Sequence, residues 1–288
     1  MYKGNDDADL ERPFRLCDRC GRPTPVNLAQ CVNCGAISIQ SVVAEEQDRV
    51  ERRYARALFS RATPVTYALL GANLAVFLLM VIAGGTENYA TLIAFGAKTN
   101  ALLQSGDWFR LITPIFIHAG VLHLMLNSYA LWMVGTQVEK LYGSARFLLI
   151  YLLSGVGGVV GSYFGQELMP RFIDAPSVGA SGSIFGLFGV LAIFGFRYRR
   201  ELPPAIRRAI TTGVLPVILI NLFIGFSIPF IDNSAHIGGL ITGSALALFI
   251  PYIAPGKERV SKAGLVIMAA CVALIIYCFA QAYQMIAE

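Results

Sequence analysis

Serine and histidine side chains that could do chemistry lie within the apolar stretches of this chain. Ser181 lies in residues 177–189, a run that is apolar apart from its serines. The chain has only three histidines, His118, His123 and His236, and all three fall in apolar segments. An intramembrane serine usually serves helix packing, because small residues let helices approach closely. Ionisable side chains at membrane depth are costly, however, so three such histidines are candidates for function.

Ser181 and His236 would form a nucleophile and its general base if their helices touched. Each lies at the start of a predicted span, on the same side of the membrane. Asp232, four residues before His236, could reach it on a helix, but it looks more like an N-terminal cap. The sequence therefore predicts a Ser–His dyad. Small residues that would let the two spans touch recur on both of them: Gly182, Gly186 and Gly189 on one, and Gly239 and Gly243 on the other.

His123 and Asn127 are four residues apart, so on a helix they project from one face. Together with the backbone N–H of Ser181 they could form an oxyanion hole. The alternative is ordinary hydrogen bonding between helices. His118 lies five residues before His123, so we expect it to point elsewhere and to be structural.

The composition excludes a soluble globular protein. Of the 288 residues, 56% are hydrophobic and 14% are charged, and the mean hydropathy is +0.60. These values predict an all-α polytopic membrane protein. The net charge of +5 does not indicate nucleic-acid binding, because the basic residues fall at the membrane edges. Apolar runs that span or nearly span a membrane lie at about 65–83, 116–135, 145–165, 180–196, 211–231, 235–253 and 263–286.

The basic residues orient these seven runs. Only Lys98, Arg110 and Arg171 fall on one side. The positive-inside rule then places the N-terminus in the cytoplasm and the C-terminus outside, in a multi-pass protein of the cell membrane. No cleavable signal peptide is expected, because no long apolar run appears before Val65. The other side has the pre-membrane arginines, Lys140, Arg146, Arg197, Arg199, Arg200, Arg207, Arg208, Lys257, Arg259 and Lys262.

Residues 84–113 are long for a loop but rich in apolar side chains. They end near Trp108-Phe109-Arg110, an aromatic–basic cluster suited to a membrane interface. Charges and glycines interrupt the segment, so we expect a folded, partly embedded extracytoplasmic element and not a span.

Four cysteines in the polar N-terminal segment predict a zinc site. They form two C-x-x-C-G knuckles, and four thiolates can close a tetrahedral structural site. Disulfides are the alternative, but a cytoplasmic location disfavours them. We expect a zinc-ribbon-like module at residues 1–45, followed by a charged linker at 46–63. The ligands would be Cys17, Cys20, Cys31 and Cys34, whereas Cys271 and Cys278 are small apolar residues of the last span.

Taken together in order, the motifs of residues 64–255 resemble the rhomboid family of intramembrane serine proteases. The resemblance implies a six-helix core, to which residues 256–288 add a C-terminal transmembrane helix. It implies transmembrane proteins as substrates, a lipid environment and no catalytic cofactor. The motifs are Trp108-Phe109-Arg110, His118 with His123 and Asn127, Glu139 with Tyr142-Gly143-Ser144, Gly179-Ala180-Ser181-Gly182, and Ala235-His236-Ile237-Gly238-Gly239.

The resemblance also assigns roles to single residues. Ser181 is the implied nucleophile and His236 the implied base, and a span at about 211–231 is the implied lateral gate. Many family members carry a tyrosine that stacks on the histidine, and Phe185 takes its place here. The remaining implied roles are oxyanion donors for His123 and Asn127 and structural polar anchors for Arg110 and Glu139.

Two other classes of function compete with a protease. A non-catalytic rhomboid-like protein would bind membrane helices for quality control, but such proteins typically lack the serine or the histidine. A transporter could use intramembrane His and Asn side chains, but it would predict inverted repeats with broken helices, and the sequence has no such symmetry.

Overall fold

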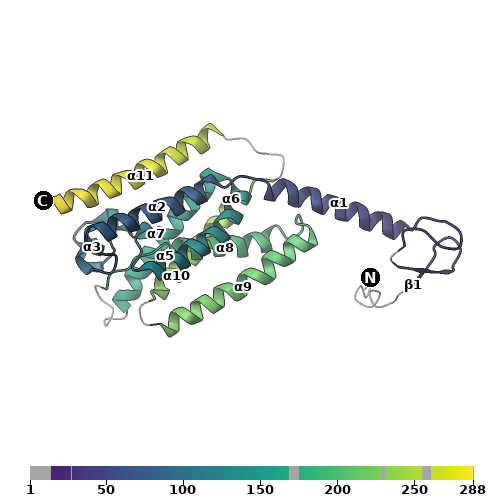
Figure 1. Cartoon of the computed structure of the whole chain (residues 1–288), viewed down its shortest axis with the longest axis horizontal. Coiled ribbons are helices and arrows are strands. Elements are labelled where there is room, and N and C mark those ends of the chain that lie inside the picture. The colour runs from purple at the N-terminus through teal and green to yellow at the C-terminus, as the bar shows by residue number, and fades with distance from the viewer. Residues whose placement is uncertain (1–13, 27, 169–174, 229–230, 255–260, 288) are drawn as a thin grey trace. The chain divides into compact units, whose positions relative to one another are not determined.

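The computed structural model describes residues 14–26, 28–168, 175–228, 231–254 and 261–287 (Figure 1). The chain divides into two compact units, residues 1–57 and 58–288. The described part is helical apart from one small sheet near the N-terminus, so the predicted all-α class is confirmed. Arg171, Lys257 and Arg259, which entered the predicted orientation, lie outside the described residues.

The first unit contains the two cysteine knuckles and a two-stranded antiparallel sheet. Strand β1 (Phe14–Leu16) pairs with β2 (Pro23–Pro25). The helix α1 (Ile39–Phe59) then begins, and it covers most of the segment predicted as a charged linker. Gly21 and Gly35 follow the knuckles with φ of +68° and +66°, the left-handed conformation in which glycine carries no penalty.

The second unit is built from helices. Near its start lie α2 (Pro64–Ile82), α3 (Tyr89–Ala94), α4 (Asn100–Gln104) and the 3₁₀-helices η1 (Trp108–Leu111) and η2 (Thr113–Phe116). They are followed by α5 (Val121–Ala130), the π-helical turn η3 (Leu131–Gly135), α6 (Thr136–Tyr142) and α7 (Ser144–Leu168). The last four are α8 (Ser181–Arg197), α9 (Pro204–Ser227), α10 (Asn233–Phe249) and α11 (Lys262–Ala287).

Three of these helices are long and apolar enough to cross a membrane, namely α2, α7 and Lys262–Met285 of α11. Ser181–Arg197 and Gly213–Ser227 are shorter apolar helices. The largest difference from the sequence prediction concerns the run 116–135, because the helix starts only at Val121 and continues through η3 to Tyr142. Pro114 lies in a 3₁₀-helix, and Gly120, with φ of +85°, precedes the helix, so the chain between them is not α-helical.

The centre of the second unit is the contact between α7, α8 and α10, and it is made by glycines. A Cβ on Gly239 would overlap the backbone of Gly182, and one on Gly243 would overlap that of Gly186. A Cβ on Gly158 of α7 would lie 3.1 Å from the Cα of Gly182. The predicted small-residue stripes therefore do bring the two helices into backbone contact.

The helices α9 and α11 flank this centre on opposite outer sides (Figure 1). Helix α11 packs on α7 and on the segment of η1 and η2, and its Phe279 ring lies 5.9 Å from Phe116. Helix α9 packs mainly on α8, and apolar side chains such as Leu219 and Phe223 remain exposed.

Residues 84–113 are folded, as the sequence predicts. The segment contains α3, α4 and η1, and it buries apolar side chains including Leu92, Leu103 and Phe109. Trp108 is 70% exposed, so it is available to an interface, while its neighbour Arg110 is buried.

Candidate active site

Ser181 is the first residue of α8, and a tightly held loop leads into it. We call residues 175–180 the entry loop. Gly179 has φ of +124° and donates its N–H to the Pro114 carbonyl at 2.9 Å. A side chain at this position would collide with another residue, because a Cβ would lie 2.7 Å from His123 Nε2. Glycine therefore lets the entry loop pass directly against His123.

His236 lies in the first turn of α10 and is 8% exposed. Its ring stacks on Phe185, with a centroid distance of 4.2 Å and an interplanar angle of 9°. Phe185 lies one helical turn after Ser181 on α8. The stack and the contact between Gly182 and Gly239 therefore hold the imidazole next to the first turn of α8.

Asn233 determines which nitrogen of His236 carries the proton. Asn233 Nδ2 donates to the Leu222 carbonyl of α9 at 3.1 Å, so its Oδ1 faces His236 Nδ1 at 3.2 Å. An acceptor at Oδ1 requires the proton on Nδ1, which leaves the Nε2 lone pair for a base. Among the described residues, no hydrogen bond joins Nε2 to Ser181 Oγ. Such bonds are often long before substrate binds.

His123 and Asn127 lie on α5 beside the entry loop. Asn127 Nδ2 donates to the His123 carbonyl at 3.1 Å, and a Cβ on Gly179 would lie 3.7 Å from that nitrogen. Both side chains thus border the loop two residues before Ser181. A pair of oxyanion donors would have to lie near Ser181, so the predicted role of these two residues stays a prediction that this placement allows.

The expectation that His118 points away from His123 is wrong. The two rings meet edge to face with centroids 5.2 Å apart. The expectation assumed helical spacing, but residues 117–120 are not helical. His118 is fully buried, and its Nε2 accepts the Ala180 N–H at 3.4 Å, so it supports the entry loop directly.

Arg110 and Glu139 are buried charged residues that bind backbone groups. Arg110 pairs with Asp107 at 2.8 Å and donates to the carbonyls of Ile93 and Ala97. Glu139 accepts the N–H groups of Val65 and Thr66, which are orphan donors at the start of α2. These contacts fit the role of structural anchors, one in residues 84–113 and the other at the α2 terminus.

Several polar residues near the site were missed by sequence reasoning. Asp232 does cap α10, as expected, since its Oδ1 accepts the Ala235 N–H at 3.0 Å. Its Oδ2 additionally accepts from Ser162 and Ser177. Lys98 is fully buried, although its place in the sequence indicated only the orientation of the predicted spans. A lysine inside an otherwise apolar stretch was the available signal.

The comparison with known families decides what this arrangement belongs to. The Rhomboid domain family model matches residues 105–253, which contain the entry loop, α5, α8 and α10. The chain belongs to the rhomboid family.

Two curated rhomboid proteases are similar to most of this chain. Rhomboid protease GluP of Bacillus subtilis is 42% identical over 230 residues, which are 79% of this chain and 43% of GluP. Rhomboid protease AarA of Providencia stuartii is 30% identical over 247 residues, 79% of this chain and 86% of AarA. RHOMBOID-like protein 5 of Arabidopsis thaliana is 34% identical over 60% of this chain and 57% of its own length. The chain thus spans less than half the length of GluP.

The four-cysteine cluster lies before the matched rhomboid domain. The four sulfur atoms lie within 4.8 Å of one another. The distance between the two sulfur atoms is 3.7 Å both for Cys17 with Cys34 and for Cys20 with Cys31. This is far longer than a disulfide bond, and it is close to the edge of a tetrahedron with zinc–sulfur distances of about 2.3 Å. The cluster therefore fits a zinc ion.

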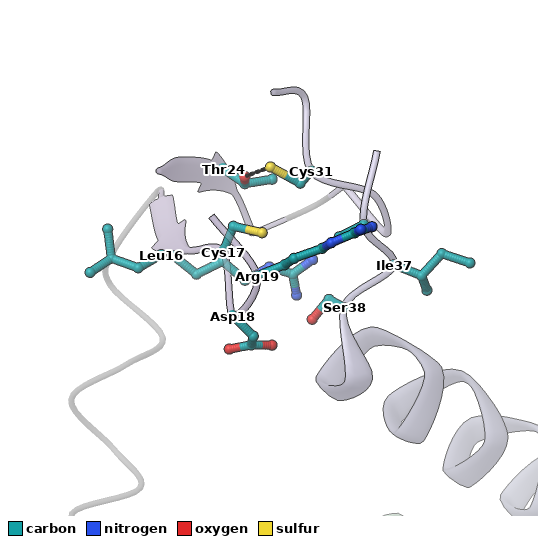
Figure 2. Close-up of a pocket in the computed structure, with 10 residues that line it drawn as sticks. Leu16, Cys17, Asp18, Arg19, Thr24, Cys31, Ile37 and Ser38 are labelled. Carbon is teal, nitrogen blue, oxygen red and sulfur yellow. Dashed lines mark hydrogen bonds between the residues drawn. The ribbon is translucent and has the colours of Figure 1, made fainter. Parts of the chain in front are cut away.

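One of the four thiols is already polarised by its surroundings. Thr24 Oγ1 donates to Cys31 Sγ at 3.3 Å (Figure 2). This hydrogen bond and the backbone N–H groups of Asn33 and Cys34 lower the pKa of Cys31 from 9.0 to about 5. A thiolate at neutral pH is the form that binds metal.

Proposed function

We propose that this chain is an intramembrane serine endopeptidase that cleaves transmembrane segments of membrane proteins through Ser181 and His236. The observation that carries the proposal is the stack of His236 on Phe185, one turn beyond Ser181. The proton arrangement that Asn233 imposes adds to it, because it leaves His236 Nε2 able to accept a proton. The relatives named as rhomboid proteases support the same reaction class.

The proposed reaction assigns one step to each of these groups. Ser181 Oγ attacks the scissile carbonyl while His236 Nε2 takes the hydroxyl proton. The negative charge on the carbonyl oxygen is held by the Ser181 N–H, His123 and Asn127. The imidazolium then protonates the leaving amine as the C–N bond breaks. Water, deprotonated by His236, then attacks the acyl carbonyl. The ester C–O bond to Ser181 Oγ breaks, and the imidazolium returns the proton to that oxygen as the acid product leaves.

Substrate helices would reach Ser181 past α9. This helix covers the α8 side of the site and holds few of its apolar side chains against the rest of the unit. A span of about 211–231 was the expected gate, and α9 contains most of it. We extend the proposal to a six-helix core plus α11 in the cell membrane, with the N-terminus in the cytoplasm.

The first test is cleavage of a single-span reporter helix by the full chain in vesicles. We expect cleavage by the wild type and none by Ser181→Ala or His236→Ala. Ser183→Ala is the matched control, because Ser183 lies on the same helix and is fully buried. Cleavage that survives Ser181→Ala would refute the assignment of the nucleophile.

A fluorophosphonate probe separates an active enzyme from a protein that only binds helices. We expect covalent labelling at Ser181 in the wild type and in Ser183→Ala. Absence of both labelling and cleavage in the wild type would favour the non-catalytic alternative, for which helix binding without turnover is the signature.

We also propose that Cys17, Cys20, Cys31 and Cys34 hold a structural zinc ion. All four positions would be filled by protein, so the ion would stabilise the fold of the module and take no part in cleavage. One zinc per chain by elemental analysis is the expected result, lost in Cys17→Ser and kept in Cys271→Ser. Zinc content that is equal in both variants would contradict the site.

A further inference from the structure

Five buried or partly buried polar side chains join segments of the second unit that are distant in sequence. They are Lys98, Ser162, Gln166, Ser177 and Asp232, which we call the Asp232 network. Lys98 precedes α4, Ser162 and Gln166 lie on α7, Ser177 lies in the entry loop, and Asp232 caps α10. The network thus connects the segment before Ser181 with the segment before His236.

The hydrogen bonds of the network run in one direction, from the lysine to the carboxylate. Lys98 Nζ donates to Gln166 Oε1 at 2.8 Å and to Ser162 Oγ at 3.0 Å. Ser162 Oγ in turn donates to Asp232 Oδ2, which also accepts from Ser177 Oγ at 2.8 Å. The Ser162 hydroxyl therefore links the ammonium group to the carboxylate.

Because the members of the network are buried or partly buried, their polar groups need hydrogen-bond partners within the protein. Lys98 and Ser162 are fully buried, and a buried ammonium group is tolerated only when hydrogen-bonded partners surround it. Asp232 uses both carboxylate oxygens, Oδ2 for the two hydroxyls and Oδ1 for the Ala235 N–H. Hydrogen bonds to an ionised acceptor are the stronger ones, so they hold their partners at defined distances.

The network meets the two proposed catalytic residues at matching places in the chain. Ser177 precedes Ser181 by four residues, and Asp232 precedes His236 by four residues. The entry loop is held at the same point by its backbone, since Ser177 N donates to the Lys98 carbonyl at 2.9 Å and Lys98 N donates to the Ser177 carbonyl at 3.2 Å. One carboxylate therefore fixes the loop that carries Ser181 and the helix that carries His236.

We propose that Asp232 is a positioning residue that sets the separation of Ser181 and His236 by binding the entry loop and α7 at once. The inference rests on the proposed function, because it concerns the same pair of residues. Among the described residues, the Asp232 carboxylate makes no hydrogen bond to the side chain of Ser181 or His236; its partners are Ser162, Ser177 and the Ala235 N–H. Asp232 thus acts through the placement of the two catalytic residues. A misplacement of about 1 Å in such a pair can cost on the order of 100-fold in rate.

Asp232→Asn tests this with little change in shape. Asparagine can still cap α10 through its oxygen, but an NH₂ group then replaces Oδ2 and cannot accept from Ser162 or Ser177. The full-length protein is assayed in vesicles for kcat and KM on the reporter helix and for the rate of fluorophosphonate labelling. We expect kcat and labelling to fall roughly 30- to 100-fold, with KM within twofold of the wild type.

Ser177→Ala is the second variant, because it removes one donor and leaves the α10 cap intact. We expect a loss of about tenfold in kcat, and a double variant no worse than Asp232→Asn alone, since both break the same bond. Asp107→Asn is the matched control, because the Asp107 carboxylate pairs with Arg110 within residues 84–113. It should lower the unfolding temperature without a selective fall in labelling rate.

The outcomes separate the two proposals. Wild-type kcat and labelling in both Asp232→Asn and Ser177→Ala would overturn the positioning role and leave the protease intact. A fall in labelling that merely tracks the loss of folded protein, as in Asp107→Asn, would also overturn it. A wild type that neither cleaves nor labels would overturn the proposed function and the positioning role with it.

Discussion

The two faces of α8 are packed in opposite ways. Toward α10, glycines bring backbone against backbone, as at Gly182 with Gly239 and Gly186 with Gly243. Helix α9 also packs on α8, but a Cβ on Gly213 of α9 would meet no atom within 4 Å. A backbone contact cannot adjust by rotating side chains, whereas a side-chain contact can. The difference fits our proposal, in which the α8–α10 face holds the reacting groups and the α9 face admits the substrate.

The most severe way to break the α8–α10 face is Gly239→Leu. The side chain would overlap the Gly182 carbonyl and push the helices apart, so we expect loss of labelling at Ser181 and about 3 kcal/mol of stability. Gly213→Leu on α9 is the control and should retain both. Labelling of Gly239→Leu within threefold of the wild type would show that this contact does not set the site.

The next largest effect is expected at Asn233, an α10 residue that contacts both His236 and α9. Asn233→Ala removes the acceptor that holds the His236 proton on Nδ1, so we expect kcat to fall on the order of 100-fold. Asn221→Ala is the matched control, because within the described part of the chain Asn221 donates to its own helix, to the Val217 carbonyl at 2.8 Å. Equal activities of the two variants would remove Asn233 from the site.

A smaller effect should follow the loss of the aromatic stack. Phe185→Ala frees the His236 ring on one side, and a stacked pair is worth about 1 kcal/mol, so kcat should fall about fivefold. Phe185→Tyr preserves the ring and should keep most of the activity. If the alanine variant were as active as the tyrosine variant, the stack would have no influence on the base.

The smallest effect is expected on the outer surface of α9. Phe223 is 73% exposed, and Phe223→Ala should change the free energy of unfolding by less than about 0.5 kcal/mol and leave the labelling rate of Ser181 unchanged. A destabilisation above about 2 kcal/mol would mean that α9 is packed as firmly as α10, and the contrast between the faces would fail.

Much of the fold was predictable because it depends on local patterns. Apolar runs predict the helices, and the spacing of Gly182, Gly186, Gly239 and Gly243 predicts the α8–α10 contact. The placement of His118 was not predictable, since it depends on residues 117–120, which are not helical and follow a 3₁₀-helix that ends at Phe116. The Asp232 network was also hidden, because its members lie on four segments whose proximity only tertiary packing creates.

The π-helical turn at Leu131–Gly135 has a consequence for how such a site can originate. A π-turn is one residue accommodated inside a continuous helix, and each residue of an α-helix turns the chain by about 100°. The extra residue is taken up within the turn, so the helix continues on both sides of it. His123 and Asn127 border the entry loop before this turn, and Glu139 binds the start of α2 after it. A single codon gained in this stretch can therefore be absorbed by the turn, with no new loop and with the side chains at both ends of the helix kept in place.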